Sequence, residues 1–100
     1  MSEIAWAAGF FDGEGNTCVQ RGRSGPYLAV NLSQNDRRTL ERFISAVGAG
    51  KVYGPYPGRP RIHHWRIVGS KAENVLALLW PHLSDAKREQ VERVRREVNG

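Results

Sequence analysis

The sequence contains almost no cysteine and no long apolar run. A single cysteine, Cys18, excludes an internal disulfide framework and a cysteine-rich zinc site. No apolar run approaches the roughly 20 residues that a transmembrane helix needs. The N-terminus begins Met-Ser-Glu, with an acid and no basic stretch, so it does not resemble a secretory signal. We therefore expect a cytoplasmic protein with no membrane partner.

Repeats, linkers and low-complexity tracts are also absent from the sequence. Its 100 residues leave room for one hydrophobic core, and the 40% hydrophobic and 25% charged residues are ordinary for a globular domain. We expect residues 1–100 to form a single domain.

Lysine is scarce, and arginine supplies most of the positive charge. Twelve of the fifteen basic residues are arginine, and the net charge is +5. Residues 16–69 hold nine basic and two acidic side chains, a local net charge of +7. Arginine suits bidentate contacts with phosphate and guanine, so this basic middle indicates a nucleic-acid partner. A solvated basic surface is the alternative, and charge alone does not decide between the two.

Apolar periodicity and turn residues predict the element order helix, two strands, helix, two strands, two helices. The helices are expected over 3–11, 37–47, 71–80 and 85–98, and the strands over 17–21, 27–33, 51–53 and 62–68. Expected N-caps are Ser2, Asn35 or Asp36, and Ser70, and residues 84–87 are expected to open the last helix. The glycines and acids of residues 12–15 are expected to end the first helix. The fold class is α+β, with a curved four-stranded antiparallel sheet.

Alternation along the strands places apolar residues on one face of this sheet and leaves the other face free. Leu28, Val30 and Leu32 share one face of their strand, and Trp65 and Ile67 are expected to point the same way. The opposite face would carry Cys18, Gln20, Tyr27, Ala29, Asn31, Ser33, Tyr53, His64 and Arg66. Such side chains can read base edges in a major groove, although a solvated face would look similar.

Four arginines lie in or beside the expected turns of the sheet. They are Arg21, Arg23, Arg59 and Arg61. Arginines at loop positions can hold phosphates while the sheet reads bases.

Residues 7–15, which read AAGFFDGEG, combine small residues with two acids. Ala5, Ala8 and Gly9 share one side of the helix and would let another backbone approach closely. Asp12 and Glu14 crowd the negative end of the helix dipole, where a cation would stabilise them, and oxygen ligands suit Mg²⁺. Carboxylates that hold metal beside a basic surface are typical of nucleic-acid enzymes. The alternative is a packed N-terminal helix with a polar end.

The same segment resembles the nine-residue signature of the LAGLIDADG homing endonucleases. Two later segments are similar to the family as well: 32–38, at the strand-to-helix junction, and 80–90, which ends in a lysine-containing helix start. The resemblance covers nearly the whole chain and implies the family's αββαββαα fold. It also implies a sequence-specific, Mg²⁺-dependent endonuclease for double-stranded DNA, with Mn²⁺ able to substitute and no small-molecule cofactor.

The resemblance assigns the metal-binding role to Glu14 and to the backbone carbonyl of Gly13. Asp12 would be the more structural acid, at the dimer interface with Ala5, Ala8 and Gly9. Because the chain holds one motif, a nuclease of this type would be a homodimer, with the two motif helices packed about a twofold axis. It would cut a near-palindromic site and leave 3′ overhangs.

The remaining catalytic roles follow from the same resemblance. Gln34 would order water near the scissile phosphate, and Arg37 or Arg38, together with Lys87, would neutralise charge there. The alternative is a non-cleaving nucleic-acid binder with the same fold, either an intron RNA maturase or a DNA-binding regulator. A pure dimerisation module would leave the basic middle of the chain unexplained.

Overall fold

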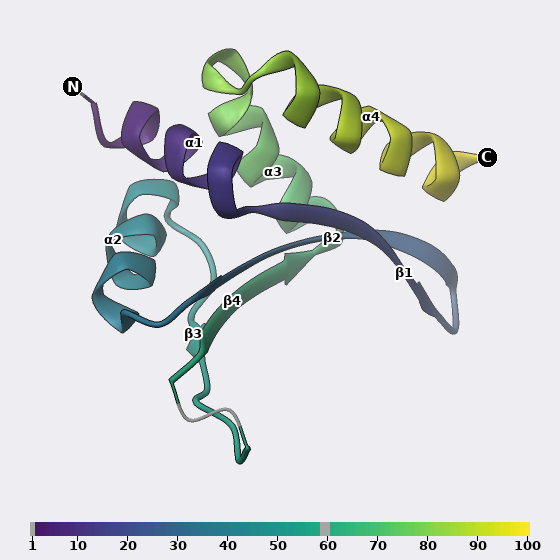
Figure 1. The fold of residues 1–100 in the computed structure, drawn as a ribbon. Helices are drawn as coiled ribbons and strands as arrows, with labels where there is room; N and C mark the ends of the chain where they lie inside the picture. Colours follow the sequence, from purple (N-terminus) through teal and green to yellow (C-terminus); the bar gives the residue numbers. More distant parts are fainter. Residues whose placement is uncertain (1, 59–60) are drawn as a thin grey trace.

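The helix and strand signals of the sequence appear in the predicted order, αββαββαα. The computed structural model describes residues 2–58 and 61–100 (Figure 1). The helices are α1 (Glu3–Glu14), α2 (Arg37–Val47), α3 (Gly69–Leu79) and α4 (Asp85–Asn99), with a 3₁₀ turn η1 (Trp80–His82) between the last two. The strands are β1 (Asn16–Gly22), β2 (Gly25–Gln34), β3 (Val52–Tyr53) and β4 (His63–Val68). The α+β prediction is confirmed.

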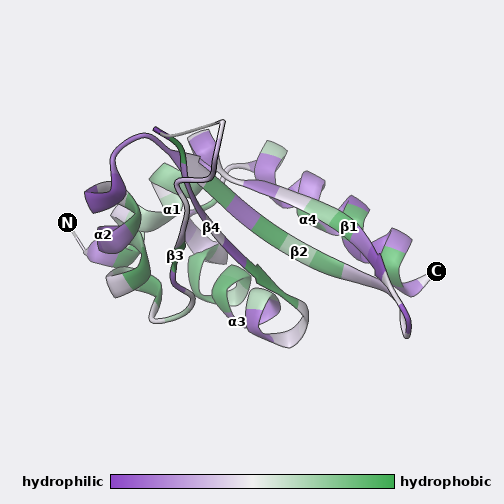
Figure 2. Cartoon of the chain, turned by 90° about the horizontal axis from the view of Figure 1, so that it is seen from below, coloured by the Kyte–Doolittle hydropathy of each residue, from purple (hydrophilic) through white to green (hydrophobic). Residues whose placement is uncertain are grey.

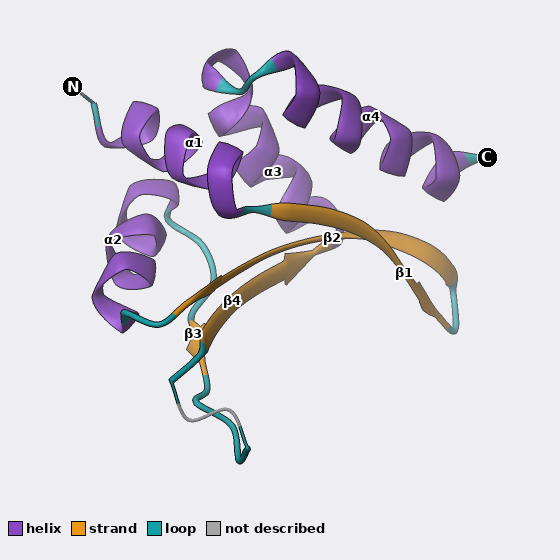
Figure 3. Cartoon of the chain, in the orientation of Figure 1, coloured by secondary structure: helices purple, strands orange, loops and turns teal. Residues whose placement is uncertain are grey.

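The strands form one antiparallel sheet in the order β1-β2-β4-β3. Its long strands curve beneath the helices, and no helix lies on the lower face in Figure 3. A tight turn at residues 23–24 joins β1 to β2, which makes this pair a hairpin. The predicted curved sheet with one open face is therefore present.

The core fills the space between the helices and the upper face of the sheet. Val30 and Leu32 of β2 are fully buried there, as is Trp65 of β4. The ring of Phe43 in α2 packs edge-on against Trp65 at 4.8 Å between centroids, and the Trp65 indole N–H donates to the carbonyl of Ala49 at 3.0 Å. The inward face that the alternation predicted is confirmed.

Helix α1 continues farther than we predicted. Asp12, Gly13 and Glu14 form its last turn, and Gly15 is the first residue with extended backbone angles. The expectation that residues 12–15 break the helix was wrong, because Gly13 keeps helical angles and Phe11 is anchored in the core. Helical glycine costs only about 1 kcal/mol, which packing readily overrides. Both acids therefore lie on the helix, next to the start of β1.

Two predicted caps are confirmed, and one is wrong. The side chains of Ser2 and Asp36 accept backbone N–H bonds at the starts of α1 and α2, and the structure adds Ser84 as the cap of α4. Helix α3 begins at Gly69 instead, directly after β4, so Ser70 lies inside its first turn and does not cap it. Gly69 makes this abrupt change of direction with a φ of 62°, which glycine adopts without steric penalty. None of the helices in residues 2–58 and 61–100 combines the length and apolar character that crossing a membrane requires.

Candidate nucleic-acid interface

The open face of the sheet carries the side chains that the sequence predicted for it. Strand register puts Cys18 opposite Ala29, Asn31 opposite Arg66, and Ser33 opposite His64. The cross-strand pairs Gln20–Tyr27 and Tyr53–His64 extend the same face. Figure 2 views the molecule from this side and shows hydrophobic and hydrophilic residues alternating along β2.

The residues of this face differ in exposure. Ser33, Tyr53 and Arg66 are exposed, and most of the others are half-buried. Ala29 is fully buried, so the prediction that it makes a direct contact was wrong. Its side chain is a single methyl group in an inner strand, between Cys18 of β1 and Val68 of β4.

The predicted phosphate-binding arginines lie at the ends of the sheet. Arg21 is the next-to-last residue of β1, Arg23 lies in the turn that follows, and Arg61 precedes β4; all three are exposed. Arg59 lies outside the described residues. The positions of the three described side chains suit contacts with a phosphate backbone that runs past the sheet.

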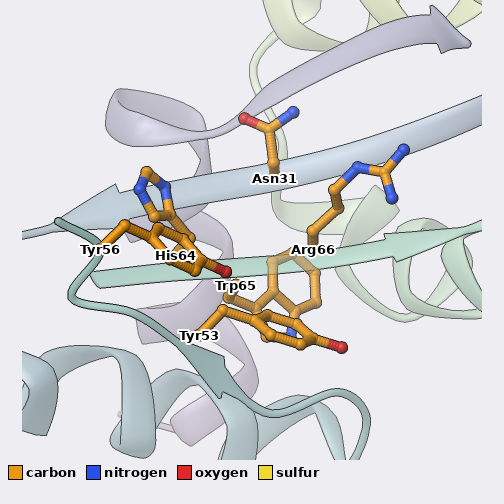
Figure 4. A pocket seen from close by; sticks show the side chains of 6 residues that line it. All are labelled: Asn31, Tyr53, Tyr56, His64, Trp65 and Arg66. Carbon is orange, nitrogen blue, oxygen red and sulfur yellow. The ribbon is translucent and has the colours of Figure 1, made fainter. Parts of the chain in front are cut away.

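A hollow of about 540 Å³ opens on this face around β4 (Figure 4). Asn31, Tyr53, His64 and Arg66 line it together with Tyr56, which the sequence analysis did not identify. Figure 4 shows the Tyr56 ring lying against the imidazole, and their centroids are 5.8 Å apart. Tyr56 stands in a loop rich in glycine and proline, where strand alternation gives no signal.

His64 is held from two sides within the hollow. Its Nδ1 lies 3.0 Å from the hydroxyl of Ser33, and Tyr56 stacks on its ring. The second ring nitrogen has no partner among the hydrogen bonds of the described residues. Fixing a side chain before it meets a ligand lowers the entropy cost of binding.

The second part of the candidate site is the carboxyl end of α1. Glu14 is exposed there, and the Lys87 ammonium donates to the carbonyl of Gly15 at 2.8 Å. Asp12 accepts a 2.9 Å hydrogen bond from the backbone N–H of Ser84, which ties α1 to the start of α4. The structure thus brings Lys87, 73 residues away in sequence from Glu14, to the end of the same helix.

The other predicted catalytic residues follow at the end of β2. Gln34 is its last residue and pairs with His63, three positions beyond the pairing of β1 with β2. Arg37 lies 3.5 Å from Glu41, and Arg38 lies 3.1 Å from Asp36. Hydrogen bonds from Arg38 hold the pKa of the Asp36 carboxyl below its usual range.

These two arginines are therefore engaged within α2, and neither ion pair involves Glu14. Both side chains are more than half exposed, so the pairs are weak and can be exchanged for a stronger anion.

The donor set at the end of α1 suits a hard divalent cation but is incomplete in one chain. Glu14 offers an exposed carboxylate, and the last carbonyls of α1 have no following helical N–H groups to bind. Oxygen donors of this kind are the ligands of Mg²⁺. In residues 2–58 and 61–100, no three His, Cys, Asp or Glu side chains are grouped to hold a metal. The further oxygens would have to come from phosphates or from a second copy of the chain.

The outer side of α1 differs from the predicted dimer surface at one residue. Ala8 is fully buried against the chain's own core, so its assignment to a dimer interface was wrong. Ala5 is half-buried, whereas Gly9 and Gly13 are exposed, and a Cβ at either glycine would meet nothing within 4 Å. The stripe of small residues on the outer side of α1 therefore consists of Ala5, Gly9 and Gly13, at intervals of four residues.

Comparison of this fold with solved structures finds homing endonucleases. The chain superposes on I-CvuI, solved with its DNA target, with a TM-score of 0.76 and 21% identity over 97% of this chain and 66% of I-CvuI. I-TnaI gives a TM-score of 0.75 and 24% identity over 96% and 71% of the two chains. The LAGLIDADG meganuclease I-AabMI, bound to uncleaved DNA, gives 0.74 and 19% over 96% and 35%.

The chain thus spans just under two thirds of I-CvuI and about one third of I-AabMI. No protein-family model and no curated protein matches its sequence. The arrangement of four helices on a four-stranded open sheet is shared with structures whose sequences differ at three quarters or more of the aligned positions. The chain has the fold of the LAGLIDADG homing endonucleases.

Proposed function

We propose that this protein is a sequence-specific endonuclease of the homing type that hydrolyses both strands of DNA. The observation that carries the proposal is the placement of Glu14 and Lys87 together at the end of α1, where the basic, open sheet begins. The sheet would bind the major groove while the end of α1 faces the scissile phosphate. The structural neighbours I-CvuI and I-AabMI are DNA complexes, which supports DNA as the substrate.

In this proposal, the chain's own residues would position the phosphate. Lys87 donates one of its three N–H groups to the carbonyl of Gly15, so two remain to contact phosphate oxygens. Gln34 would orient the attacking water, and Arg37 or Arg38 would leave its ion pair to neutralise developing charge. Glu14 and the carbonyl of Gly13 would hold Mg²⁺, or Mn²⁺ in its place. The metal would supply Lewis-acid stabilisation at the phosphate.

The active form would be a homodimer, because one chain carries one Glu14 and half of the DNA-binding surface. The stripe of Ala5, Gly9 and Gly13 would allow two copies of α1 to pack closely about a twofold axis, with Asp12 bracing each helix end through Ser84. Residues 1–100 would form one domain of this dimer. Its target would be a near-palindrome cut to leave 3′ overhangs, and the protein would act in the compartment that holds that DNA.

Cleavage of a plasmid pool with randomised targets in Mg²⁺ tests the proposal. The wild type should give linear products with paired 3′ overhangs, and Glu14→Gln should abolish cleavage while binding stays within a few-fold. Glu89→Gln, at an exposed acid on α4, is the matched control and should cut normally. Lys87→Met should bind DNA but cut more slowly by about 10²–10³-fold, the usual effect of losing one charge-stabilising donor.

Two outcomes contradict the proposal. A wild type that binds DNA but cuts nothing with Mg²⁺ or Mn²⁺ would favour a non-cleaving nucleic-acid binder. A Glu14→Gln variant that loses binding and cleavage equally would show that Glu14 has a structural role.

A further inference from the structure

An apolar row crosses the open face of the sheet between polar neighbours. It consists of Cys18 on β1, Ala29 on β2 and Val68 on β4, which the strand register aligns side by side. Ala29, in the middle of the row, is fully buried, whereas Val68, at one end of the row, is 37% exposed. The Cys18 thiol is half-buried and its sulfur accepts a hydrogen bond from the Gln20 amide at 3.4 Å. The exposed surface of the row therefore consists of the methyl groups of Val68 and part of Cys18, whose sulfur is already hydrogen-bonded.

The rows on either side are polar. Asn31 and Arg66 form the next row toward the carboxyl end of α1, and Gln20 and Tyr27 form the next row toward the β1–β2 turn. Asn and Gln side chains are suited to bidentate bonds with adenine, and Arg is suited to guanine. A strip of three apolar side chains between such rows stands out, because a face that served only solubility would carry charges there.

We infer that Val68, at the exposed end of the row of Cys18, Ala29 and Val68, binds the 5-methyl group of a pyrimidine in the DNA, that of thymine or of 5-methylcytosine. The inference rests on the proposed function only in requiring that the sheet bind DNA in the major groove. There the 5-methyl group is the apolar feature that a base edge presents, and apolar side chains are its usual contacts. Val68 offers exposed methyl groups for this contact, and the buried Ala29 beside it presents no polar side-chain atom.

The position of this base in the target follows from strand geometry. Successive rows on one face are two residues apart, or roughly 6.7 Å, and base pairs rise by about 3.4 Å. Strands that lie along the groove therefore put the methyl contact about two base pairs from the base that Arg66 reads. It lies on the side away from the Glu14 end of α1.

The test uses a duplex selected by the full-length protein from a randomised pool, with binding measured in Ca²⁺, the ion present in the I-CvuI complex. Each thymine is replaced in turn by deoxyuridine, which removes only the methyl group. Burial of one methyl group predicts a loss of affinity of about four-fold at one position of each half-site, and about fifteen-fold when both half-sites are changed. Deoxycytidine and 5-methyldeoxycytidine at the same position tell the two pyrimidines apart, since the methyl group should restore part of the affinity to either base.

Val68→Ser identifies the residue responsible. The substitution removes both methyl groups of Val68 and leaves a hydroxyl, so the preference for thymine over deoxyuridine should disappear. Leu78→Ser, at a comparably exposed residue on α3, is the control and should keep that preference.

The two possible failures are distinct. A protein that binds no duplex overturns the proposed function itself. A protein that binds tightly but treats deoxyuridine and thymine alike at every position, or a Val68→Ser variant that still discriminates between them, overturns the role of Val68.

Discussion

Replacing Gly9 by alanine should have opposite effects on the folded chain and on its dimer. Gly9 is exposed on α1, its backbone angles are helical, and a Cβ there would meet nothing within 4 Å. Alanine is favoured over glycine in a helix by about 1 kcal/mol, so the unfolding free energy of the single chain should rise by about that amount. For a domain of this size, the melting temperature should increase by roughly 4–8 °C.

In the proposed dimer, the same methyl group lies between two closely packed helices. Overpacking of a tight contact costs about 1–3 kcal/mol, so Gly9→Ala should weaken dimerisation roughly 5- to 150-fold. Sedimentation equilibrium over a range of concentrations measures this directly, because the single chain has a mass of 11.2 kDa. Thermal unfolding at the lowest concentration, where the monomer dominates, measures the stabilisation.

Asn74→Ala provides the control. Asn74 is exposed on α3, so the substitution should raise helix stability by several tenths of a kcal/mol without changing the dimer. Unchanged or tighter dimerisation of Gly9→Ala would refute the packing of α1 against its copy. A lower melting temperature of the monomer would refute the claim that Gly9 faces open space.

Two further predictions concern stability. Gly50→Ala should destabilise the fold by about 3 kcal/mol or more in chemical denaturation, because φ is 87° and the new Cβ would overlap the Trp65 indole. Gly58 has a similar φ of 85°, but a Cβ there would meet nothing within 4 Å, so Gly58→Ala should cost only about 1–2 kcal/mol. Equal losses of stability in the two variants would contradict the overlap with Trp65. Hydrogen bonds from Arg42 lower the pKa of Glu3 from its ordinary value of 4.5, so this pair stabilises the fold above pH 4.5 and the contribution is lost as the pH falls through the lowered pKa. Melting temperatures from pH 6 to pH 3 should therefore fall less steeply for Glu3→Gln than for the wild type, and identical slopes would show that the pair contributes nothing.

The elements and the faces of the sheet could be predicted because their signals are local. Strand alternation and helix caps each depend on residues a few positions apart, so the local sequence is enough to predict them. The caps Ser2 and Asp36 and the alternation along β2 are examples. The composition of the open face follows from the same two-residue period, and the register confirms it.

The wrong predictions concern features that depend on contacts between residues far apart in the sequence. Ala8 and Ala29 are small residues whose burial depends on which neighbours cover them, and this is set by tertiary packing. The end of α1 depends on the anchoring of Phe11 in the core, which outweighs the low helix propensity of Gly13. Tyr56 reaches His64 through a loop, and a loop has no period from which its direction could be predicted.

The strand order has a consequence for how this protein avoids aggregation. A domain that keeps one whole sheet face bare for a ligand also risks pairing with other chains through the unpaired backbone groups of its edge strands. Here the edges are β1 and β3. The β3 edge is only two residues long, and Pro55 and Pro57 follow it closely; the β1 edge is seven residues long and carries the exposed Arg21 near its end. A very short edge followed by prolines, and a second edge that carries charge, give an incoming strand little to pair with, so the open face can bind a groove while the edges resist pairing with another sheet.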